Sequence, residues 1–241
     1  MKGTTPEGAR SEQEAAAWVR AMFGRVAHRY DLANHLLSFN VDRYWRAHTV
    51  RRVRDVLARP EARVLDVCCG TGDLLRAFAR RRPAGIAVMG SDFCHPMLMA
   101  ARTKVGGGNL FEADALCLPL PDASLDLIAA AFGFRNLANY EAGLREMRRV
   151  LRGGGVAAIL EFSQPPNPLF RAFYDFYSRR ILPAIGGALS GSRDAYAYLP
   201  ESVRKFPAPE ELAELMRATG FGGVEFERLT GGIVALHLGH V

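Results

Sequence analysis

Cysteine and lysine are scarce in this sequence, and long apolar runs are missing. Only 4 of the 241 residues are cysteine, and two of them are adjacent, at Cys68 and Cys69. This provides neither a disulfide framework nor the C-x-x-C spacing typical of zinc sites. No apolar run approaches the roughly 18 residues that a membrane-spanning helix needs, and the N-terminal segment lacks the apolar core of a secretory signal. We therefore expect a soluble cytoplasmic protein without a metal site.

The charge is unevenly distributed along the chain. The formal net charge is +6, and the residues through Pro60 hold 11 Lys/Arg against 6 Asp/Glu, an excess of five. A basic terminal region attracts nucleic acid or an anionic lipid surface, or serves only solubility. The chain contains 49% hydrophobic and 23% charged residues. This composition is typical of a globular protein and argues against a disordered one.

The hydrophobic pattern predicts an α/β fold. The spacing of apolar residues predicts an amphipathic helix over residues 11–27. Ser11 and Glu14 have the spacing of a capping box and mark its start. From Ala62 onward, short apolar runs alternate with helical segments, which is typical of a parallel sheet with crossover helices. We predict strands at 63–68, 85–92, 109–114, 125–132 and 156–162, and helices at 73–81, 95–104 and 139–151.

The C-terminal part of the chain departs from this alternation. Three glycines at 153–155 are expected to end the preceding helix, and 163–206 has no sheet pattern. A helix follows from Pro209 to Gly220, and the last two apolar runs predict an antiparallel hairpin. We predict a single domain with an N-terminal helical cap (1–60), a cofactor-binding core (61–163), an inserted substrate cap (164–206) and a C-terminal helix and hairpin (207–241).

A glycine turn between the first predicted strand and the following helix is the strongest candidate binding site. Gly70 and Gly72 remove the side chains that would keep a ligand from the backbone and the helix N-terminus. Asp92 ends the next strand. In nucleotide-binding folds, the carboxylate at this position accepts hydrogen bonds from the ribose hydroxyls. A dinucleotide loop needs Gly or Ala at the position of Leu75, and no P-loop motif occurs. The pattern therefore favours an adenosine ligand without phosphates, of which S-adenosylmethionine is the common one.

Two further carboxylates belong to this predicted site. Asp114 ends the third strand and either accepts a hydrogen bond from the adenine amino group or caps the next turn, while the adjacent backbone N–H of Ala115 serves a ring nitrogen. Asp66, in the first strand, holds either the glycine loop or the ammonium group of the ligand. The residues leave these alternatives open.

Four separated motifs along the chain have the form of family signatures. The stretch from Tyr30 to Ser38, followed by Trp45, is similar to the signature Y-D-x-M-N-x-x-[LIVM]-S-x-x-x-H-x-x-W, with Ala33 in place of Met and Asp42 in place of His. The other matches are Arg149 to Gly155 continuing to Glu161-Phe162-Ser163, the F-G-x-R-N motif at 132–136, and the Y-x-Y-L-x-x-S motif at 196–202. With these four motifs the chain resembles the ubiquinone/menaquinone biosynthesis C-methyltransferase family, within the class I S-adenosylmethionine-dependent methyltransferases.

The resemblance implies a mostly parallel seven-stranded sheet with helices on both faces, and methylation of a ring carbon on a prenylated quinol. It carries Thr71, Asp92, Asp114 and Ala115 over as cofactor contacts, whereas Ala131 stands where the family often has Ser. The acceptor is either demethylmenaquinol or the methoxy-benzoquinol precursor of ubiquinol.

Carbon methylation needs an electron-rich ring, so the protein must orient the quinol and assist its phenolate. Arg135 follows the fourth strand and supplies a fixed cation, or only pairs with a carboxylate at the sheet edge. Asn136 orients the other oxygen. Tyr30 and Asp31 form a hydrogen-bonding or proton-accepting pair, or serve packing. Tyr198, together with Tyr196, is a weaker candidate for the same cover.

An aromatic helical stretch at 168–181 places five apolar side chains on one face. This face accepts a polyprenyl tail, rests on the inner face of a membrane, or packs against the sheet. The aromatic insert favours a hydrophobic substrate over nucleic acid.

Two alternatives to quinol methylation stay open. One is methylation of a different small-molecule or RNA acceptor, and the other is a non-catalytic role as a partner in quinone assembly. The sequence is also compatible with a homodimer.

Overall fold

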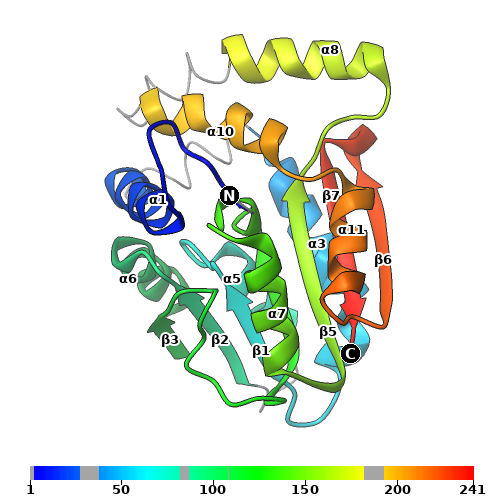
Figure 1. Cartoon of the computed structure of the whole chain (residues 1–241). Helices are drawn as coiled ribbons and strands as arrows, with labels where there is room; N and C mark the ends of the chain where they lie inside the picture. Colours follow the sequence, from blue (N-terminus) through cyan, green and yellow to red (C-terminus); the bar gives the residue numbers. More distant parts are fainter. Residues whose placement is uncertain (1–2, 28–37, 82–86, 108, 182–192) are drawn as a thin grey trace.

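Seven strands form one sheet in the order β3-β2-β1-β4-β5-β7-β6 (Figure 1). The computed structural model describes residues 3–27, 38–81, 87–107, 109–181 and 193–241. The first five strands pair in parallel, and β7 lies antiparallel between β5 and β6. This confirms the predicted sheet and its terminal hairpin. The strands are β1 (Arg63–Val67), β2 (Ala87–Asp92), β3 (Asn109–Glu112), β4 (Leu125–Ala131), β5 (Leu151–Phe162), β6 (Gly223–Leu229) and β7 (Val234–His240).

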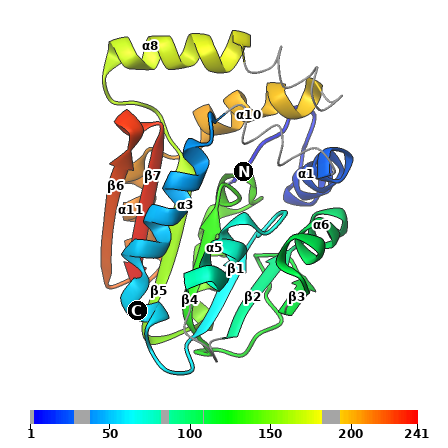
Figure 2. The ribbon, with the colours of Figure 1, turned by 180° about the vertical axis from the view of Figure 1, so that it is seen from behind.

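Helices cover both faces of the sheet, as predicted. The helices α7 and α11 lie on the face toward the viewer in Figure 1, and α3 and α5 lie on the opposite face, seen in Figure 2. The described helices that pack around the sheet are α3 (Val41–Arg52), α4 (Arg54–Leu57), α5 (Asp73–Arg81), α6 (His95–Val105), α7 (Tyr140–Val150) and α11 (Pro209–Ala218).

The sheet separates two hydrophobic cores because successive side chains of a strand point to opposite faces. On β4, Leu127 and Ala129 belong to the core that contains Trp45 and Phe78 of α3 and α5. Their neighbours, including Ile128, belong to the core beneath α7 and α11. A fully buried double-sided sheet of this kind gives strands that are almost continuously apolar, as β4 and β5 are.

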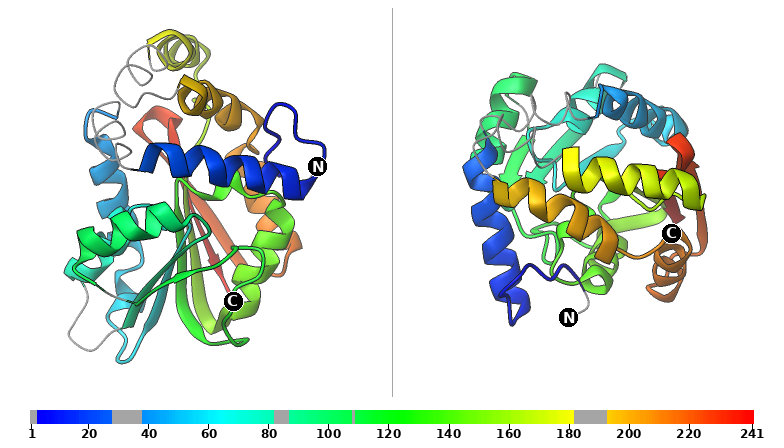
Figure 3. Two further views of the ribbon diagram at one scale, coloured as in Figure 1. Left: turned by 90° about the vertical axis from the view of Figure 1, so that its left-hand side faces the viewer. Right: turned by 90° about the horizontal axis from the view of Figure 1, so that it is seen from above.

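Three further helices lie above the carboxyl ends of the parallel strands (Figure 3). They are α1 (Glu12–Val26), α8 (Pro168–Phe176) and α10 (Arg193–Lys205). Ser11 caps α1 by accepting a hydrogen bond from the Glu14 backbone N–H, and Asn167 caps α8 in the same way. Because α1 and α10 come from opposite ends of the chain, the region above the sheet is assembled by tertiary contacts.

One local prediction is wrong. The predicted helix 139–151 is present as α7, but the three glycines after it lie inside β5 instead of ending the helix. Gly154 has a φ of 74°, in an irregular stretch where the pairing of β4 with β5 shifts register. The left-handed backbone of Gly154 therefore serves a bulge at the start of a strand. The division of the chain into a cap, a core and an insert stays a prediction.

Candidate active site

The glycine loop between β1 and α5 has an unusual backbone. Cys68, Gly70 and Gly72 all have positive φ angles, of 54°, 54° and 86°. The left-handed conformation is readily accessible to glycine and costs a cysteine energy. A side chain at Gly133 would place its Cβ 2.5 Å from that of Cys68, so the turn after β4 also requires glycine to approach this loop. The loop is thus built by close backbone contact.

Asp92 ties the end of β2 to the glycine loop. One carboxylate oxygen accepts a hydrogen bond from the Gly70 backbone N–H at 2.8 Å, and the other accepts from the Cys94 backbone N–H at 2.9 Å. Burial raises the pKa of Asp92 to about 6. The side chain lines the same cleft as Gly70 and Thr71, where sequence reasoning expected it.

Asp66 is a buried carboxylate in the same cleft. It is 1% exposed, and neither oxygen reaches normal hydrogen-bond geometry with a described residue. Burial raises the pKa of Asp66 to about 8, and weaker effects of the Leu75 backbone N–H and the Arg46 charge lower it. A buried carboxylate without a strong partner is costly, and such groups gather where a ligand binds.

The remaining predicted cofactor residues line the same cleft. Asp114 accepts a hydrogen bond from the Leu116 backbone N–H at 2.9 Å, and Ala115 lies next to it on the wall. The Thr71 hydroxyl accepts a hydrogen bond from Lys104 Nζ at 3.0 Å. The carboxyl ends of β1, β2 and β3 therefore bring the predicted residues together, with the exception of Gly72. Gly72 packs against Ala101 of α6 and shapes the turn.

A second, larger cavity lies beside the cleft. Its volume is about 630 Å³, which is within the range of small-molecule sites. The walls come from α1, α3, α8, α10 and the end of β5, and they are mostly apolar and aromatic. Typical lining residues are Val41, Trp45, Phe162, Phe170, Tyr174, Tyr177 and Val203.

The cleft and the cavity meet at three shared residues. Phe23, Arg46 and Phe132 line both. Phe132 has a φ of 62°, and its ring lies 5.8 Å from the ring of Trp45. The Arg46 guanidinium lies 5.2 Å from the centre of the Phe132 ring and pairs with Asp42. A ligand in the cleft can therefore meet a second ligand in the cavity at this junction.

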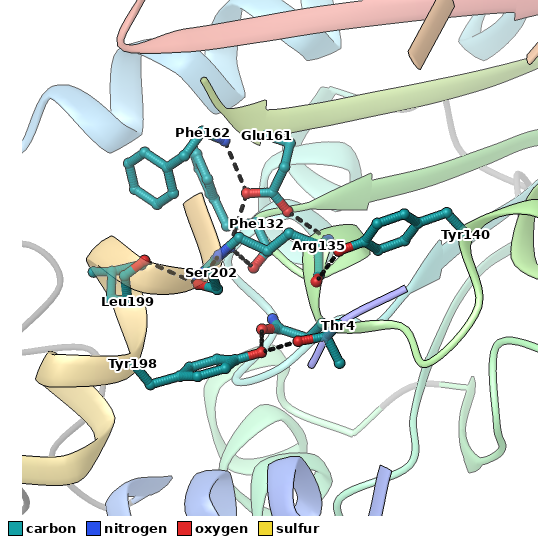
Figure 4. Close-up of polar contacts among 10 residues, drawn as sticks. Thr4, Phe132, Arg135, Tyr140, Glu161, Phe162, Tyr198, Leu199 and Ser202 are labelled. Atoms are coloured by element: carbon teal, nitrogen blue, oxygen red, sulfur yellow. Dashed lines mark hydrogen bonds and ion pairs between the residues drawn. The ribbon is translucent and has the colours of Figure 1, made fainter. Parts of the chain in front are cut away.

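Arg135, a predicted catalytic residue, is held in a buried ion pair (Figure 4). Its Nη1 lies 2.8 Å from Glu161 Oε1, and its backbone N–H donates to Glu161 Oε2 at 3.1 Å. The guanidinium also contacts the Phe132 carbonyl and lies 5.3 Å from the centre of the Phe162 ring. Arg135 also lines the large cavity. Its pairing with Glu161 is the pairing with a sheet-edge carboxylate that the sequence offered as one of two roles.

Asn136 and Tyr198 connect the two cavities. The Tyr198 hydroxyl donates to Asn136 Oδ1 at 3.1 Å. It also lies 2.6 Å from the Thr4 hydroxyl, as Figure 4 shows. Asn136 lines the cleft and Tyr198 lines the large cavity. Burial raises the pKa of Tyr198, so the hydroxyl stays protonated at neutral pH.

Two of the four predicted catalytic residues, Tyr30 and Asp31, lie outside the described residues, and so does the side chain of Tyr196. Three residues of the site were not predicted. Arg46 and Thr4 carry no motif of their own, so only the fold reveals them. Glu161 had a signal, because it is a single carboxylate at the end of the apolar run that forms β5.

Among the described residues, no three His, Cys, Asp or Glu side chains gather in a way that would hold a metal ion. None of the described helices has the length and hydropathy to cross a membrane.

The fold and the glycine-loop cleft define a class I S-adenosylmethionine-dependent methyltransferase. The model of the ubiE/COQ5 methyltransferase family matches residues 9–241, and the chain belongs to this family. It is 48% identical to demethylmenaquinone methyltransferase of Thermus thermophilus over 223 residues, which cover 90% of this chain and 99% of that relative. It is 44% identical to the ubiquinone/menaquinone biosynthesis C-methyltransferase UbiE of Geobacter sulfurreducens over 227 residues, covering 92% and 87% of the two chains.

Solved structures show the same fold at low identity. A S-adenosylmethionine-dependent methyltransferase of Thermotoga maritima matches with a TM-score of 0.66 and 19% identity, covering 91% of this chain and 98% of that chain. The [4+2]-cyclase SpnF matches with a TM-score of 0.64 and 20% identity, covering 93% and 78%. Because the second protein is named as a cyclase, the fold alone does not determine the reaction.

Proposed function

We propose that this protein transfers the methyl group of S-adenosylmethionine to a ring carbon of a prenylated quinol, with demethylmenaquinol as the acceptor. The observation that carries the proposal is the pair of cavities that join at Phe132. One is a polar cleft over the carboxyl ends of β1 to β3, and the other is a large apolar cavity. Membership of the family and the names of its relatives agree with this reaction.

S-adenosylmethionine would occupy the polar cleft and supply an electrophilic methyl group. We assign the ribose diol to Asp92, the adenine amino group to Asp114, and an adenine ring nitrogen to the backbone N–H of Ala115. Asp66, Gly70, Thr71 and Gly72 complete the proposed cofactor site. The backbone hydrogen bonds that fix Asp92 keep its carboxylate in one orientation, so little freedom is lost when a ligand binds.

The quinol ring would lie in the apolar cavity with the reacting carbon toward Phe132. An electron pair of the ring forms the new carbon–carbon bond, and the bond from sulfur to methyl breaks with its electrons remaining on sulfur. The ring carbon then loses its proton and the ring becomes aromatic again. A reduced ring is required because only the quinol, or its phenolate, is electron-rich enough to attack.

The protein's contribution is to orient the ring, exclude water and stabilise the phenolate. Arg135 borders the cavity and is held by Glu161, so it supplies an oriented guanidinium at the wall. Asn136 is held by Tyr198 and would orient a quinol oxygen. Tyr30 and Asp31 stay the proposed proton-accepting pair. The bulky apolar wall of the cavity excludes water from the reacting carbon.

A methyl-transfer assay tests the proposal. Labelled S-adenosylmethionine is incubated with a short-chain demethylmenaquinol kept reduced, with the oxidised quinone and the methoxy-benzoquinol as parallel acceptors. We expect a carbon-methylated product from the reduced naphthoquinol and none from the oxidised form. Cofactor binding without product from either quinol would contradict the proposal.

We also propose that the protein works in the cytoplasm and rests on the inner face of the membrane through α8. This helix contains no buried residue, and Leu169, Phe173 and Phe176 are 82%, 67% and 59% exposed. These three exposed side chains do not pack into the core, whereas Phe170 and Tyr174 of the same helix are half-buried and line the large cavity. Phe173 also lines the large cavity, so a prenyl tail would leave the cavity beside this helix. The exposed Arg171 and Arg180 add the positive charge that favours an anionic lipid surface.

Vesicle sedimentation tests this contact. The wild-type protein should sediment with vesicles of phosphatidylglycerol, and Phe173→Asp should weaken that binding. Met99→Asp is the matched control, because Met99 is a half-exposed apolar residue on α6. Equal sedimentation of all three proteins would contradict the contact through α8. The homodimer stays a prediction, which the mass of the protein in solution would test.

A further inference from the structure

We propose that Asp42 accepts the proton of the quinol hydroxyl while the neighbouring ring carbon takes the methyl group, and that Ser38 and Arg46 position its carboxylate. This inference rests on the proposed function, since it assigns a base to the same reaction. Asp42 replaces the His of the family signature, so the inference concerns a position at which this chain departs from that signature.

Asp42 is a buried carboxylate in the wall of the large cavity. Among the described residues that line this cavity, two are carboxylates, Asp42 and Asp175. Asp42 is 4% exposed, whereas Asp175 is half-buried and belongs to α8, at the top of the molecule in Figure 1. Desolvation makes a charged group costly in an apolar wall, and such groups gather at functional sites. Asp42 is therefore the carboxylate of this cavity to examine for a role in the reaction.

The position of Asp42 on α3 brings it close to the junction of the two cavities. It lies one helical turn before Arg46, which lines both the cleft and the cavity. Trp45, on the same helix, has its ring 5.8 Å from that of Phe132, which also lines both. The N-terminal end of α3 lies toward the carboxyl ends of the parallel strands in Figure 2. An acceptor ring at the junction would therefore lie within about one helical turn of Asp42.

Two donors hold the Asp42 carboxylate in one orientation. The Ser38 hydroxyl donates to Oδ1 at 2.7 Å, and Arg46 pairs with Oδ2. Both partners line the large cavity as well. A carboxylate can accept about four hydrogen bonds, so these two contacts are compatible with a further one from a ligand hydroxyl. Because the carboxylate is already oriented, little freedom is lost when the quinol binds.

The chemistry of the quinol explains why an arginine-paired carboxylate is basic enough. Each free ring carbon of a 1,4-quinol is next to a carbon that bears a hydroxyl. As that ring carbon bonds to the methyl group and sulfur keeps the electrons of the breaking bond, the hydroxyl becomes part of a protonated ketone, which is a strong acid. Asp42 takes its proton and leaves a neutral ketone.

The remaining proton transfers restore the quinol. The methylated carbon gives up its proton, for which Tyr30 and Asp31 stay the proposed acceptors. The ketone oxygen takes back the proton that Asp42 holds, and the ring becomes aromatic. Each methyl transfer thus releases one proton and returns Asp42 to its starting form.

The rival role for Asp42 is structural. It lies in the first turn of α3, where an acidic side chain favours the helix, and it holds Arg46 in place. The two roles differ in their dependence on pH. A phenolic hydroxyl has an ordinary pKa of about 10, so an increasing fraction of the quinol is ionised as the pH rises and needs no base. A structural defect would slow the reaction by the same factor at every pH.

Single-turnover methyl transfer from pH 7 to pH 9.5 separates these roles. The assay uses saturating labelled S-adenosylmethionine and a reduced short-chain demethylmenaquinol without oxygen. The test variant is Asp42→Asn, which keeps the size of the side chain. Asp55→Asn is the matched control, because Asp55 also lies in the first turn of a helix, α4, and its side chain is 91% exposed. Calorimetry with S-adenosylhomocysteine and thermal unfolding check the cofactor site and the fold of each variant.

We expect Asp42→Asn to slow methyl transfer about 100-fold or more at pH 7, the scale of a lost general base, and to bind S-adenosylhomocysteine like the wild type. The rate of this variant should rise more steeply with pH than that of the wild type, so the difference shrinks toward pH 9.5. Asp55→Asn should match the wild type at every pH.

Ser38→Ala is a second variant, and it carries the test if Asp42→Asn does not fold. It removes the donor to Oδ1 and keeps the carboxylate, so we expect a smaller loss, of about tenfold, with the same trend in pH. The other titratable groups around the cavity are present in all of these proteins, so comparison with the wild type separates their effects from that of Asp42. They include Arg46, Asp73, Arg135, Tyr174, Asp175 and Tyr177.

Two results would overturn the inference. One is a folded Asp42 or Ser38 variant that transfers the methyl group as fast as the wild type at pH 7. The other is a loss of rate by the same factor at every pH, which would assign Asp42 to the positioning of Arg46 and the start of α3. A wild-type protein that binds S-adenosylhomocysteine and methylates no quinol would instead overturn the proposed function itself, so the two failures are distinguishable.

Discussion

The polar cleft and the apolar cavity are built in different ways. The cleft comes mainly from three strand ends and the segments that follow them, at 66–74, 92–93 and 113–116, and from the segment 131–138 after β4, while α1 and α3 add a few residues such as Phe23 and Arg46. Its geometry is fixed by backbone hydrogen bonds, as between Asp92 and Gly70. The cavity draws its walls from α1, α3, α8 and α10, which are far apart in the sequence, and side-chain contacts hold its polar groups.

This difference matches the demands of the two ligands. A cofactor that is used by many methyltransferases can be held by a loop that depends on local sequence. A methyl acceptor with a hydrophobic tail needs a binding cavity with a large apolar wall, and only tertiary packing provides such a wall. Substitutions in the cleft should therefore change ligand affinity, whereas substitutions in the cavity should also change the stability of the fold.

The largest expected effect is on the cavity side, at Arg135. Arg135→Met leaves Glu161 charged and buried, so the free energy of unfolding should fall by about 3–5 kcal/mol. Urea denaturation followed by circular dichroism measures this. The double variant Arg135→Met with Glu161→Met removes both charges and should recover most of the stability.

The outcome decides between the two roles of Arg135. A double variant that is stable but does not turn over would support a catalytic role beyond the ion pair. A single variant as stable as the wild type would contradict the importance of the pair for folding.

On the cleft side, Asp92→Ala should weaken S-adenosylmethionine binding by roughly 2–3 kcal/mol, because a charged hydrogen bond to the ribose is lost. Calorimetry measures the affinity. Asp55→Ala is the control, since the Asp55 side chain is 91% exposed on α4. Unchanged binding by the Asp92 variant would remove this carboxylate from the ribose.

The pH dependence of cofactor binding tests the cleft further. Because burial raises the pKa of Asp66 to about 8, the side chain is mostly protonated at pH 7 before the ligand binds. An ammonium group pairs with the ionised form, so binding releases a proton and the affinity should rise with pH. Between pH 6.5 and pH 8 we expect the affinity for S-adenosylhomocysteine to rise with pH. The rise should be nearly tenfold per pH unit near pH 6.5 and smaller near pH 8.

Calorimetry in buffers of different ionisation enthalpy counts the released protons. Asp66→Asn should bind more weakly and lose this dependence. A wild-type affinity that stays constant from pH 6.5 to pH 8 would show that Asp66 does not pair with the ammonium group.

The smallest expected effect concerns the contact that joins the two regions. Tyr198→Phe removes the hydroxyl that bonds to Asn136 and lies against Thr4, and should lower the free energy of unfolding by about 1 kcal/mol. Thr4→Val tests the same contact from the other side. In a double-mutant cycle the two effects should be less than additive. Full additivity would contradict the contact.

Local patterns predicted the cleft, and tertiary contacts explain what they missed. Gly70, Asp92 and Asp114 stand at strand ends, and parallel strands bring such positions to one edge. Arg46 acquires its place only when α3 packs on the face of the sheet, and Thr4 only when the N-terminal segment packs near that edge. No periodicity contains this information.

The same limit applies to Arg135. The sequence placed it correctly after β4, yet its partner Glu161 lies at the end of a different strand. The glycines at 153–155 predict a helix end because glycine commonly ends helices, whereas in the structure they form a bulge in β5. A glycine's preference for a left-handed backbone does not say which element uses it.

A crystal structure with S-adenosylhomocysteine and a short-chain menaquinol would test the two joined cavities most directly. We predict adenosine over β1 to β3 and the quinol ring in the large cavity, with its methyl-bearing carbon facing the sulfur across the junction at Phe132 and its tail beside α8. A quinol bound outside that cavity, or a ring carbon turned away from the sulfur, would contradict the arrangement.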